Sequence, residues 1–500
     1  MSILRNSLAN FLGGVLPALV LLVTIPIMVS GLGLTNYGLL TLVGAITGYF
    51  SIIDINLTAG SVKYIAEYRA LGDTRRESQT IILGLGFYLA LGVIGAGALL
   101  LFAVQLATRV FNIPPSLQIV AVSAIRLAAL GFLISQVQQY LNSLPQAIQR
   151  YDVTAKLESI FGILVPVVSA ATLQFGAGLL EMIEIRIAGS ALHAAALGLI
   201  CRRLFPDLRI AFPTREIMVR MMSFSAFGYL SKLAYLTYSY ADKLIIGSRI
   251  GVAALTYFVI PSTLASRLTG LVFRLCSVMF PHASALAAAG RMSELERHYL
   301  MGSRYMFFIN GAIAISLAGL AHPILSHWLN PDFARTGTIV MQIVAATLWV
   351  DSLTNLPSLV TDGLGYPHVN ACCSTIRVLG GLGLVVIGVG LYGVVGAAAG
   401  NFVAAVIGSP AMLAYTHGRT VPIALLRVVR ESFAPPCVVL LPLGALTWQL
   451  ASYADSSWFS LLVVVAALSL LYIGGAWIMV VYPGHRLFLL RGLGKLLARE

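Results

Sequence analysis

Charged residues are scarce in this chain, and this shortage decides its class. Only 10% of the 500 residues are Asp, Glu, Lys or Arg, whereas 58% are hydrophobic. A soluble domain carries about 25% charged residues. No soluble fold buries so much apolar surface, so we expect a chain that crosses a membrane many times.

Acidic residues and cysteines are also few. There are 19 acidic against 32 basic residues, a net charge of +13. The cations lie mainly in loops between apolar runs, so they indicate membrane topology, and we expect no nucleic-acid partner. The cysteine number is odd and no metal-ligand spacing occurs, which predicts small apolar fillers, no metal and no cofactor. The five are Cys201, Cys276, Cys372, Cys373 and Cys437.

The signatures of common membrane enzymes and ATPases are missing. The one Gly-Lys pair, Gly494-Lys495, is followed by Leu496, so the chain has no P-loop. The longest polar stretches, such as 201–216, are short, and the loops expected outside the cell are short as well. These features favour a transporter over an enzyme.

Apolar runs of spanning length are the dominant pattern. They predict an all-α polytopic membrane protein with about fourteen transmembrane helices, the first of them retained rather than cleaved as a signal peptide. The predicted spans are 8–30, 36–62, 79–104, 116–142, 153–175, 181–201, 217–241, 252–281, 301–321, 338–360, 370–391, 394–414, 433–451 and 457–481.

The cations are distributed unevenly over the alternating loops. If the chain starts in the cytoplasm, 22 of the 32 cations fall on the cytoplasmic side, including Arg491, Lys495 and Arg499, and four fall on the opposite side. Positive charge concentrates in cytoplasmic loops. We therefore expect both termini in the cytoplasm.

The two halves of the chain align with each other. A shift of 218 residues places Gly33 on Gly251 and Gly72 on Gly290, and "AIQRYDVTA" (147–155) meets "GLGYPHVNA" (363–371) at a shift of 216. Parallel repeats are a transporter architecture with the substrate site at the repeat interface. We expect two parallel six-helix lobes around a central cavity, with two further helices appended. The predicted divisions are 1–212, 213–430 and 431–500, the last including a cytoplasmic tail.

Six cations lie inside the predicted spans. An arginine at the centre of a lipid-facing helix costs about 3 kcal/mol, so these side chains must face a wet cavity or a partner. Local pairing with Glu181 and Glu184, or snorkelling, is sufficient for Arg186. The deeper five are Arg126, Lys232, Arg267, Arg274 and Arg377.

Asp54 and Asp351 are the deep acids, and we consider both as gating or coupling residues. The repeat puts Asp54 and Arg274 at similar depth, so we expect them to pair across the lobe interface. This pair either closes a gate or is a permanent salt bridge. Arg267 has no acid at a comparable position, and a guanidinium matches phosphate oxygens, so we expect it to bind an anion.

The seventh span, "FGYLSKLAYLTYSYADKL", combines tyrosines with a lysine. Tyr229, Lys232 and either Tyr235 or Leu236 fall on one helical face. Tyrosine offers an apolar ring and a hydroxyl, which suits sugar rings, although an interfacial aromatic belt is the alternative. The candidate substrate-binding residues are Arg267, Arg274, Lys232, Arg126, Arg377, Tyr229 and Tyr235.

Two stretches resemble a known family. "YADKLIIGSRIGVAALTYF" (240–258) resembles the signature at the start of the second lobe of polysaccharide flippases, and "VSGLGLTNYGLLTLVGAI" (29–46) looks like its first-lobe counterpart. The 6+6+2 pattern is similar to the polysaccharide transporter branch of the multidrug/oligosaccharidyl-lipid/polysaccharide exporter superfamily, which includes the O-antigen flippases. The resemblance implies transfer of a polyprenyl-pyrophosphate-linked oligosaccharide to the outer leaflet of a plasma membrane by alternating access. It also implies that membrane lipids and the polymerase and glycosyltransferases of the same pathway are partners.

Two other functions stay open from the sequence. A cationic-drug exporter of the same superfamily would require unpaired buried acids, whereas basic groups outnumber acidic ones within the spans. A membrane-bound polysaccharide polymerase or glycosyltransferase is the second alternative. The expected location is the bacterial inner membrane or the archaeal plasma membrane.

Overall fold

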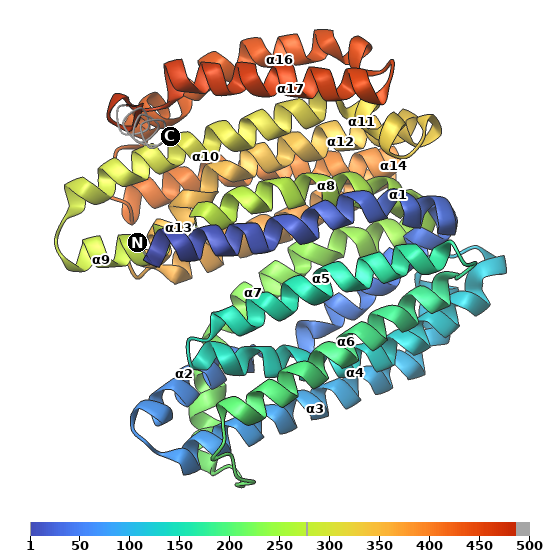
Figure 1. Ribbon diagram of the computed structural model, residues 1–500, viewed down its shortest axis with the longest axis vertical. Coiled ribbons are helices and arrows are strands. Elements are labelled where there is room, and N and C mark those ends of the chain that lie inside the picture. The colour runs from blue at the N-terminus through green and yellow to red at the C-terminus, as the bar shows by residue number, and fades with distance from the viewer. Residues whose placement is uncertain (1, 277–278, 487–500) are drawn as a thin grey trace, which may run out of the picture. The chain divides into compact units, whose positions relative to one another are not determined.

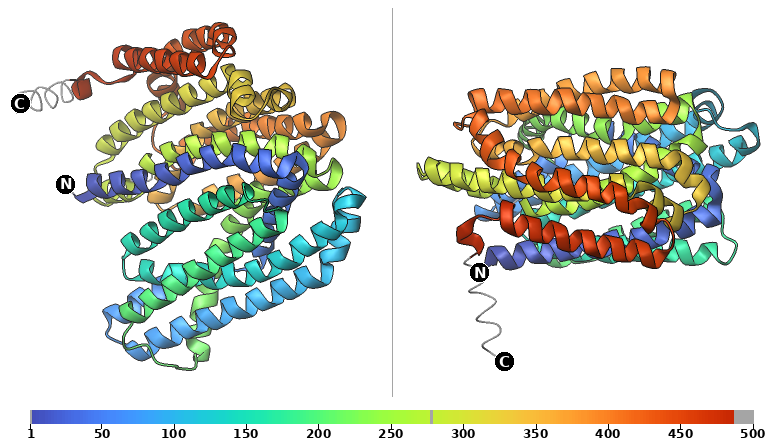
Figure 2. Two further views of the ribbon diagram at one scale, coloured as in Figure 1. Left: turned by 45° about the vertical axis from the view of Figure 1, so that its right-hand side comes forward. Right: turned by 90° about the horizontal axis from the view of Figure 1, so that it is seen from above.

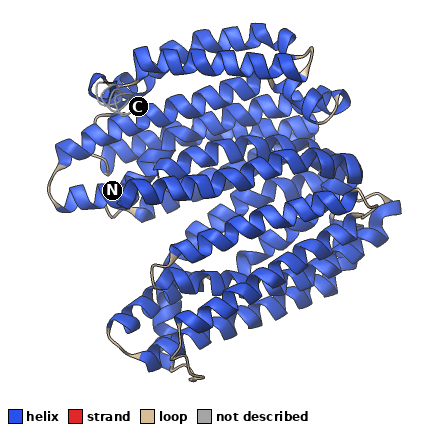
Figure 3. Ribbon diagram, in the orientation of Figure 1, coloured by secondary structure: helices blue, strands red, loops and turns tan. Residues whose placement is uncertain are grey.

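The computed structural model describes residues 2–276 and 279–486, and these residues form helices and no strand (Figure 3). Arg491, Lys495 and Arg499 lie outside the described residues. Eleven helical segments of the described part are long and apolar enough to cross a membrane. The expected all-α, multi-pass architecture is therefore confirmed, whereas the number fourteen stays a prediction.

Two of the long segments contain a break where the sequence predicts the end of one span and the start of the next. In α1 (Ser2–Phe50) the break is Gly33, which has a φ of 75°. In α14 (Pro367–Arg419) it lies at Tyr392 and Gly393. The predicted span 217–241 corresponds to α7 (Arg215–Arg249), which is not among the eleven.

The chain divides into two compact units. The N-terminal unit holds residues 8–259 with 389–394, and the C-terminal unit holds 260–388 and 395–500 with 1–7. The N-terminal unit thus includes α7, which the sequence assigns to the second lobe. Spatial compactness and internal repetition are different criteria, so the lobes 1–212 and 213–430 stay a prediction.

The N-terminal unit is built on three long helices that run side by side, α3, α4 and α6 (Figure 1). Glycines on α3 receive aromatic rings of α4. A Cβ atom at Gly84 would lie 2.3 Å from the Tyr140 ring, and one at Gly95 would lie 2.2 Å from the Phe132 ring. Small residues allow membrane helices to approach closely. The helices that begin in this unit after α1 are α2 (Leu57–Ala70), α3 (Thr74–Gln105), α4 (Gln118–Ala147), α5 (Tyr151–Leu173), α6 (Leu179–Leu204), α7 and α8 (Val252–Cys276), with short turns η1 (Ser51–Ile53), η2 (Leu106–Val110) and η3 (Pro115–Leu117).

The C-terminal unit has its own core around α10, which packs against α12 and α16. A Cβ atom at Gly311 of α10 would lie 2.8 Å from Nε1 of Trp349. The last two long helices, α16 and α17, lie side by side in both Figure 1 and Figure 2. This unit also contains α9 (Met279–Ala288), α10 (Met292–Gly319), α11 (Ala321–Trp328), α12 (Pro331–Asp351), η4 (Ser352–Thr354), α13 (Asn355–Gly363), α15 (Leu425–Val428), η5 (Val429–Phe433), α16 (Ala434–Ala454), α17 (Trp458–Gly475) and η6 (Ala476–Val480).

One predicted span is wrong at its end. The sequence suggests an unbroken helix over 36–62, but the helix ends at Phe50, η1 follows, and α2 begins at Leu57. Asp54 is extended and Asn56 is left-handed, with a φ of 63°. Asp and Asn favour such breaks because their side chains bond nearby backbone groups. Asp54 is therefore at a break between helices and not within one.

The internal repeat reappears in the backbone. Gly72 and Gly290, which the shift of 218 superimposes, have φ angles of 70° and 69°. Gln149 and Gly365, related by the shift of 216, are also left-handed, with φ angles of 59° and 90°. Turns of the same handedness thus follow corresponding helices in the two halves, which supports the repeat independently of sequence identity.

The two stretches that carry the family resemblance pack together within the N-terminal unit. A Cβ atom at Gly38 would lie 1.8 Å from the carbonyl oxygen of Val252. The buried Thr256 hydroxyl donates to the carbonyl oxygen of Leu34 at 2.7 Å. The glycine of the first stretch is therefore required by the backbone of the second.

Candidate functional site

Asp54 is held at the break between η1 and α2 by its own local hydrogen bonds. Its Oδ1 atom accepts from the backbone N–H of Asn56 at 2.9 Å and from that of Leu57 at 3.4 Å. A side-chain oxygen that accepts from the first N–H groups of a helix stabilises the start of that helix. Local hydrogen bonds thus orient the carboxylate in addition to its contacts with distant residues.

Three side chains from distant helices complete the surroundings of this carboxylate. The Tyr88 hydroxyl of α3 donates to Oδ1 at 2.9 Å, and Lys232 of α7 forms an ion pair and hydrogen bond with Oδ2. Gln139 of α4 donates to Oδ2 at 3.4 Å. Asp54 is fully buried, whereas the Lys232 side chain is 14% exposed. We call Asp54, Tyr88, Gln139 and Lys232 the Asp54 cluster.

Neighbouring contacts hold the Asp54 cluster in place. The Tyr229 hydroxyl donates to the carbonyl oxygen of Ile52 at 2.7 Å, which ties α7 to η1 one turn before Lys232. The ring of Tyr88 stacks on that of Tyr140, with centroids 5.3 Å apart. Asp54 and Tyr88 are buried, whereas Lys232 is partly exposed and Gln139 is exposed. The buried carboxylate stays paired, because an unpaired buried charge would be costly.

The sequence analysis missed the glutamines of this region. Gln136, Gln138 and Gln139 lie within four consecutive positions of α4 and reach three different partners. Besides the bond to Asp54, Gln136 donates to the Ser51 hydroxyl at 3.4 Å, and Gln138 bonds Nδ1 of His193 at 2.9 Å. The available signal was three amides in an otherwise apolar span, because amides inside a membrane require partners.

The second deep acid, Asp351, is paired within the C-terminal unit. Its Oδ1 atom lies 2.5 Å from Nη2 of Arg377, and the Ser409 hydroxyl donates to the same oxygen at 3.3 Å. The two charged side chains are 14% and 22% exposed. The Arg377 side chain packs over Gly408, and a Cβ atom at Gly408 would lie 2.9 Å from the arginine Cδ. Asp351 and Arg377, chosen separately from the sequence, thus form one site.

Three other candidate cations are exposed. Arg126 on α4 and Arg267 and Arg274 on α8 all have exposed side chains. Among the residues that the structure describes, neither Arg126 nor Arg267 has an acidic group within ion-pair distance. Of the alternatives on α7, Tyr235 is 67% exposed and Leu236 is buried, so Leu236 shares the inward face with Lys232.

Two pairings expected from the sequence involve Asp54 and Arg186. Asp54 pairs with Lys232 inside the N-terminal unit, and the pairing of Asp54 with Arg274 stays a prediction. The local pairing of Arg186 with Glu181 or Glu184 is not found in the described part of the chain. Glu181 instead accepts from the backbone N–H of Gly178 at 2.8 Å and caps α6.

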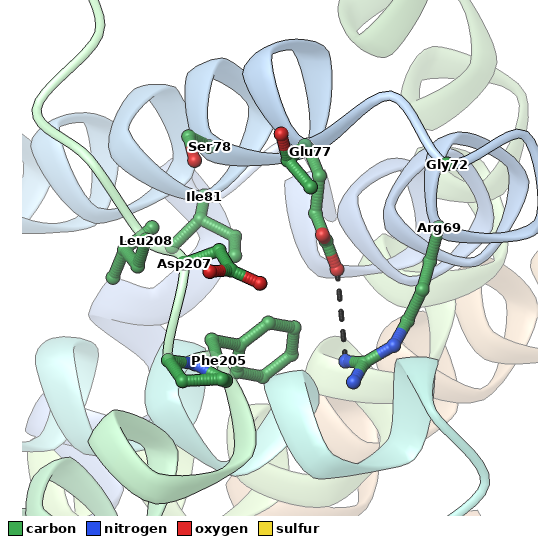
Figure 4. Close-up of a pocket in the computed structure, with 10 residues that line it drawn as sticks. Arg69, Gly72, Glu77, Ser78, Ile81, Phe205, Asp207 and Leu208 are labelled. Carbon is green, nitrogen blue, oxygen red and sulfur yellow. Dashed lines mark ion pairs between the residues drawn. The ribbon is translucent and has the colours of Figure 1, made fainter.

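A polar pocket lies at the turn between α2 and α3 of the N-terminal unit (Figure 4). Arg69 lies 3.6 Å from Glu77, donates to the carbonyl oxygen of Leu204 at 3.3 Å and lies over the Phe205 ring. Asp207 faces the same space. These contacts attach the segment after α6 to the α2–α3 turn, a structural role that the sequence did not predict.

Comparison with known proteins places this geometry in a family context. The family model described as "Polysaccharide biosynthesis protein" matches residues 3–287, more than half of the chain. The "Putative O-antigen transporter" of Shigella flexneri is 21% identical over 416 residues, which cover 80% of this chain and 94% of that protein. The "Probable flippase AglR" of Haloferax volcanii is 21% identical over 266 residues, 52% of this chain and 54% of that protein.

Solved structures share the fold. The lipid II flippase MurJ in an inward closed conformation matches with a TM-score of 0.71 and 14% identity, covering 94% of this chain and 98% of that chain. An inward-facing multidrug resistance MATE family transporter of the MOP superfamily matches with a TM-score of 0.67 and 16% identity, covering 82% and 98%. At such low identity these likenesses show the fold. The chain therefore belongs to the polysaccharide biosynthesis protein family and is a flippase-like, multi-pass membrane transporter with a MOP-superfamily fold.

Proposed function

We propose that the chain transfers a polyprenyl-pyrophosphate-linked oligosaccharide across the plasma membrane by alternating access. Its cargo is an O-antigen or exopolysaccharide repeat unit on its lipid carrier. The name of the relative in Shigella flexneri supports an O-antigen cargo, and the name of the relative in Haloferax volcanii supports a flippase activity. Location in the bacterial inner membrane, with both termini in the cytoplasm, belongs to the same proposal.

The balance of charge within the spans is the observation that carries this proposal. Both deep acids are neutralised, Asp54 by Lys232 and Asp351 by Arg377. Arg126 and Arg267 are exposed and have no acidic partner among the described residues. The charge that remains available to a cargo is therefore positive, and a positive site suits a pyrophosphate.

The same balance argues against a cationic-drug exporter. Such a site needs a carboxylate that is free to attract an organic cation. Asp54 is fully buried and already accepts from Lys232, Tyr88 and Gln139, so it has little capacity left. The names of two relatives, a putative O-antigen transporter and a probable flippase, likewise support transport over a polymerase or glycosyltransferase activity.

Within this function, each candidate residue has a defined role. Arg267, Arg274 and Arg126 attract the pyrophosphate, and Tyr229 and Tyr235 are sugar-facing candidates. The Asp54–Lys232 and Asp351–Arg377 pairs are candidates for gating or coupling, because an ion pair that opens would change the local charge. The polymerase and glycosyltransferases of the same pathway would be partners of this transporter.

A deletion strain tests the proposal. Loss of the gene should abolish surface polysaccharide and cause lipid-linked repeat units to accumulate inside the cell. Complementation should fail with Arg267→Ala and partly succeed with Arg267→Lys, which keeps the charge but not the planar fork. Arg335→Ala is the matched control, because Arg335 pairs with Asp332 at an exposed helix start. Normal surface polysaccharide in the deletion strain would contradict the proposed function.

A further inference from the structure

A pocket of about 310 Å³ lies within the N-terminal unit, and the residues of the Asp54 cluster are not among those that line it. Its walls come from α1, α4 and α6, with one residue each from η1 and α7. The α6 wall consists of Ile183, Arg186, Ile187 and Ser190, a spacing of three, four and seven positions that forms one helical face. The second half of α1 and the middle of α4 contribute faces with the same spacing. The pocket is therefore a regular product of three packed helices.

The lining combines one cation with several hydroxyl groups. Arg186 is the charged residue among the lining residues. It makes no ion pair and no hydrogen bond with the residues that the structure describes, and its side chain is exposed. The hydroxyl groups of the lining belong to Thr47, Ser51, Ser135, Ser190 and Tyr240.

The existing hydrogen bonds of these hydroxyls restrict what they offer to a ligand. The Thr47 hydroxyl donates to the carbonyl oxygen of Val43 at 3.0 Å, and the Ser135 hydroxyl donates to that of Phe132 at 2.8 Å. Their remaining lone pairs are acceptors. A ligand that uses Thr47 and Ser135 must therefore bring hydroxyl donors of its own, together with an anionic group for Arg186. The hydroxyls of Ser190 and Tyr240 make no side-chain hydrogen bond with the described residues and can donate to the ligand.

We propose that this pocket binds an acidic sugar residue of the cargo, with the sugar carboxylate on Arg186 and the ring hydroxyls on Thr47 and Ser135. The inference rests on the proposed function and specifies its substrate class. A guanidinium binds a carboxylate through two parallel hydrogen bonds. A phosphate diester would supply the anion but no O–H donor, so it would leave the acceptor oxygens of Thr47 and Ser135 unused.

Binding to the purified full-length protein in detergent tests the inference. The probes are a water-soluble tetrasaccharide that contains one glucuronic acid and the same tetrasaccharide with its carboxyl group reduced. The wild type should bind the acidic probe about tenfold more tightly or better, as expected for a charge-assisted hydrogen bond. Arg186→Gln should abolish this preference without changing the affinity for the reduced probe, and Arg186→Lys should retain part of it.

A second variant tests the pocket itself. A Cβ atom at Gly44 meets nothing within 4 Å, so Gly44→Leu fills the pocket without a clash at its base and should weaken binding of both probes. Gly97→Leu on α3 is the matched control, because Gly97 has the same free space but lies outside the pocket. Arg109→Gln is the control for loss of charge.

Several results would overturn the inference. One is equal affinity of the wild type for the two probes, and another is an unchanged preference for the acidic probe in Arg186→Gln. A third is equal probe binding by Gly44→Leu and Gly97→Leu. The last is displacement of the acidic probe by inorganic pyrophosphate but not by the reduced tetrasaccharide. Failure here is separable from failure of the proposed function. Vesicles that contain the wild-type protein and a neutral lipid-linked oligosaccharide should show transfer if the flippase function holds, whichever way the two soluble probes bind.

Discussion

The carboxylate of Asp54 and the ammonium group of Lys232 form an ion pair although 178 positions separate them in the chain. The pair joins the break after η1 to the middle of α7 inside the N-terminal unit. Because Asp54 is fully buried, its charge is tolerable only while these partners stay in place. The pair is thus a constraint on the fold as well as a candidate for coupling.

Removing one member of this pair should be worse than removing both. Lys232→Met should destabilise the protein by about 3 kcal/mol, because it leaves a buried carboxylate without its counter-charge. The double variant Asp54→Asn with Lys232→Met should recover most of that loss. The temperature at which half of the detergent-purified protein loses its monodisperse peak reports the difference. Strictly additive losses would show that the two side chains do not interact.

Removal of the Tyr88 hydroxyl alone should lower the stability of the protein measurably. It donates to Asp54 at 2.9 Å and accepts from the backbone N–H of Thr58 at 3.2 Å. Tyr88→Phe leaves the buried Asp54 carboxylate and the partly buried Thr58 N–H each short of a hydrogen bond, which should cost about 2 kcal/mol and lower the midpoint in the same thermal assay. Tyr151→Phe is the matched control, because Tyr151 is 56% exposed and should change little. Equal midpoints for the two variants would contradict this account.

The contact between the two signature stretches makes Gly38 irreplaceable. Gly38→Ala places a Cβ atom 1.8 Å from the carbonyl oxygen of Val252, and a backbone atom cannot rotate away. We expect a loss of about 3 kcal/mol, seen as poor yield of monodisperse protein. Gly44→Ala on the same helix meets nothing within 4 Å and should be neutral or stabilising. Equal yields of both variants would count against the close packing.

Much of the fold could be predicted from the sequence, because membrane-spanning helices are recognised by the length and apolarity of their sequences. The breaks at Gly33 and Gly393 fall within predicted gaps between spans, and the repeat appears again as left-handed turns at Gly72 and Gly290. The end of α1 could not be predicted. Residues 50–56 are nearly as apolar as the helix before them, and the helix breaks where the Asp54 carboxylate accepts from the backbone N–H groups of Asn56 and Leu57.

The candidate site was predicted less well, because charge pairing depends on tertiary contacts. Asp351 and Arg377 were both identified, but not as partners. For Asp54 the repeat suggested Arg274, whereas Lys232 of α7 is the residue that contacts it within its own unit. Arg186, expected to pair with a nearby glutamate, faces a hydroxyl-lined pocket instead. Sequence spacing locates a charge along a helix, but not the neighbour that another helix brings to it.

Packing over Gly408 should control the Asp351–Arg377 pair. Gly408→Ala places a Cβ atom 2.9 Å from Cγ and Cδ of Arg377, so the arginine must shift away from Asp351. We expect a loss of about 2 kcal/mol from overpacking and from the weakened ion pair. Gly418→Ala on α14 has free space and serves as the control. If Gly408→Ala in the background of Arg377→Ala, which lacks Cγ and Cδ, still lowers the unfolding midpoint by the full amount, the effect does not run through the arginine.

The contacts of Arg69 should control access to the segment after α6. Arg69→Ala removes the hydrogen bond to Leu204, the ion pair with Glu77 and the packing over Phe205. Because the Arg69 side chain is 42% exposed, we expect a loss of about 1 kcal/mol. That loss raises the fraction of molecules in which this segment is detached about fivefold. The backbone N–H of Arg209, within the segment, donates to Ser78 at 3.3 Å. Limited trypsin cleavage after Arg209 should therefore accelerate by a similar factor. The control variant is Arg75→Ala, because Arg75 is exposed and does not line the pocket. It should be cleaved at the wild-type rate. Equal rates for the two variants would show that Arg69 does not hold this segment.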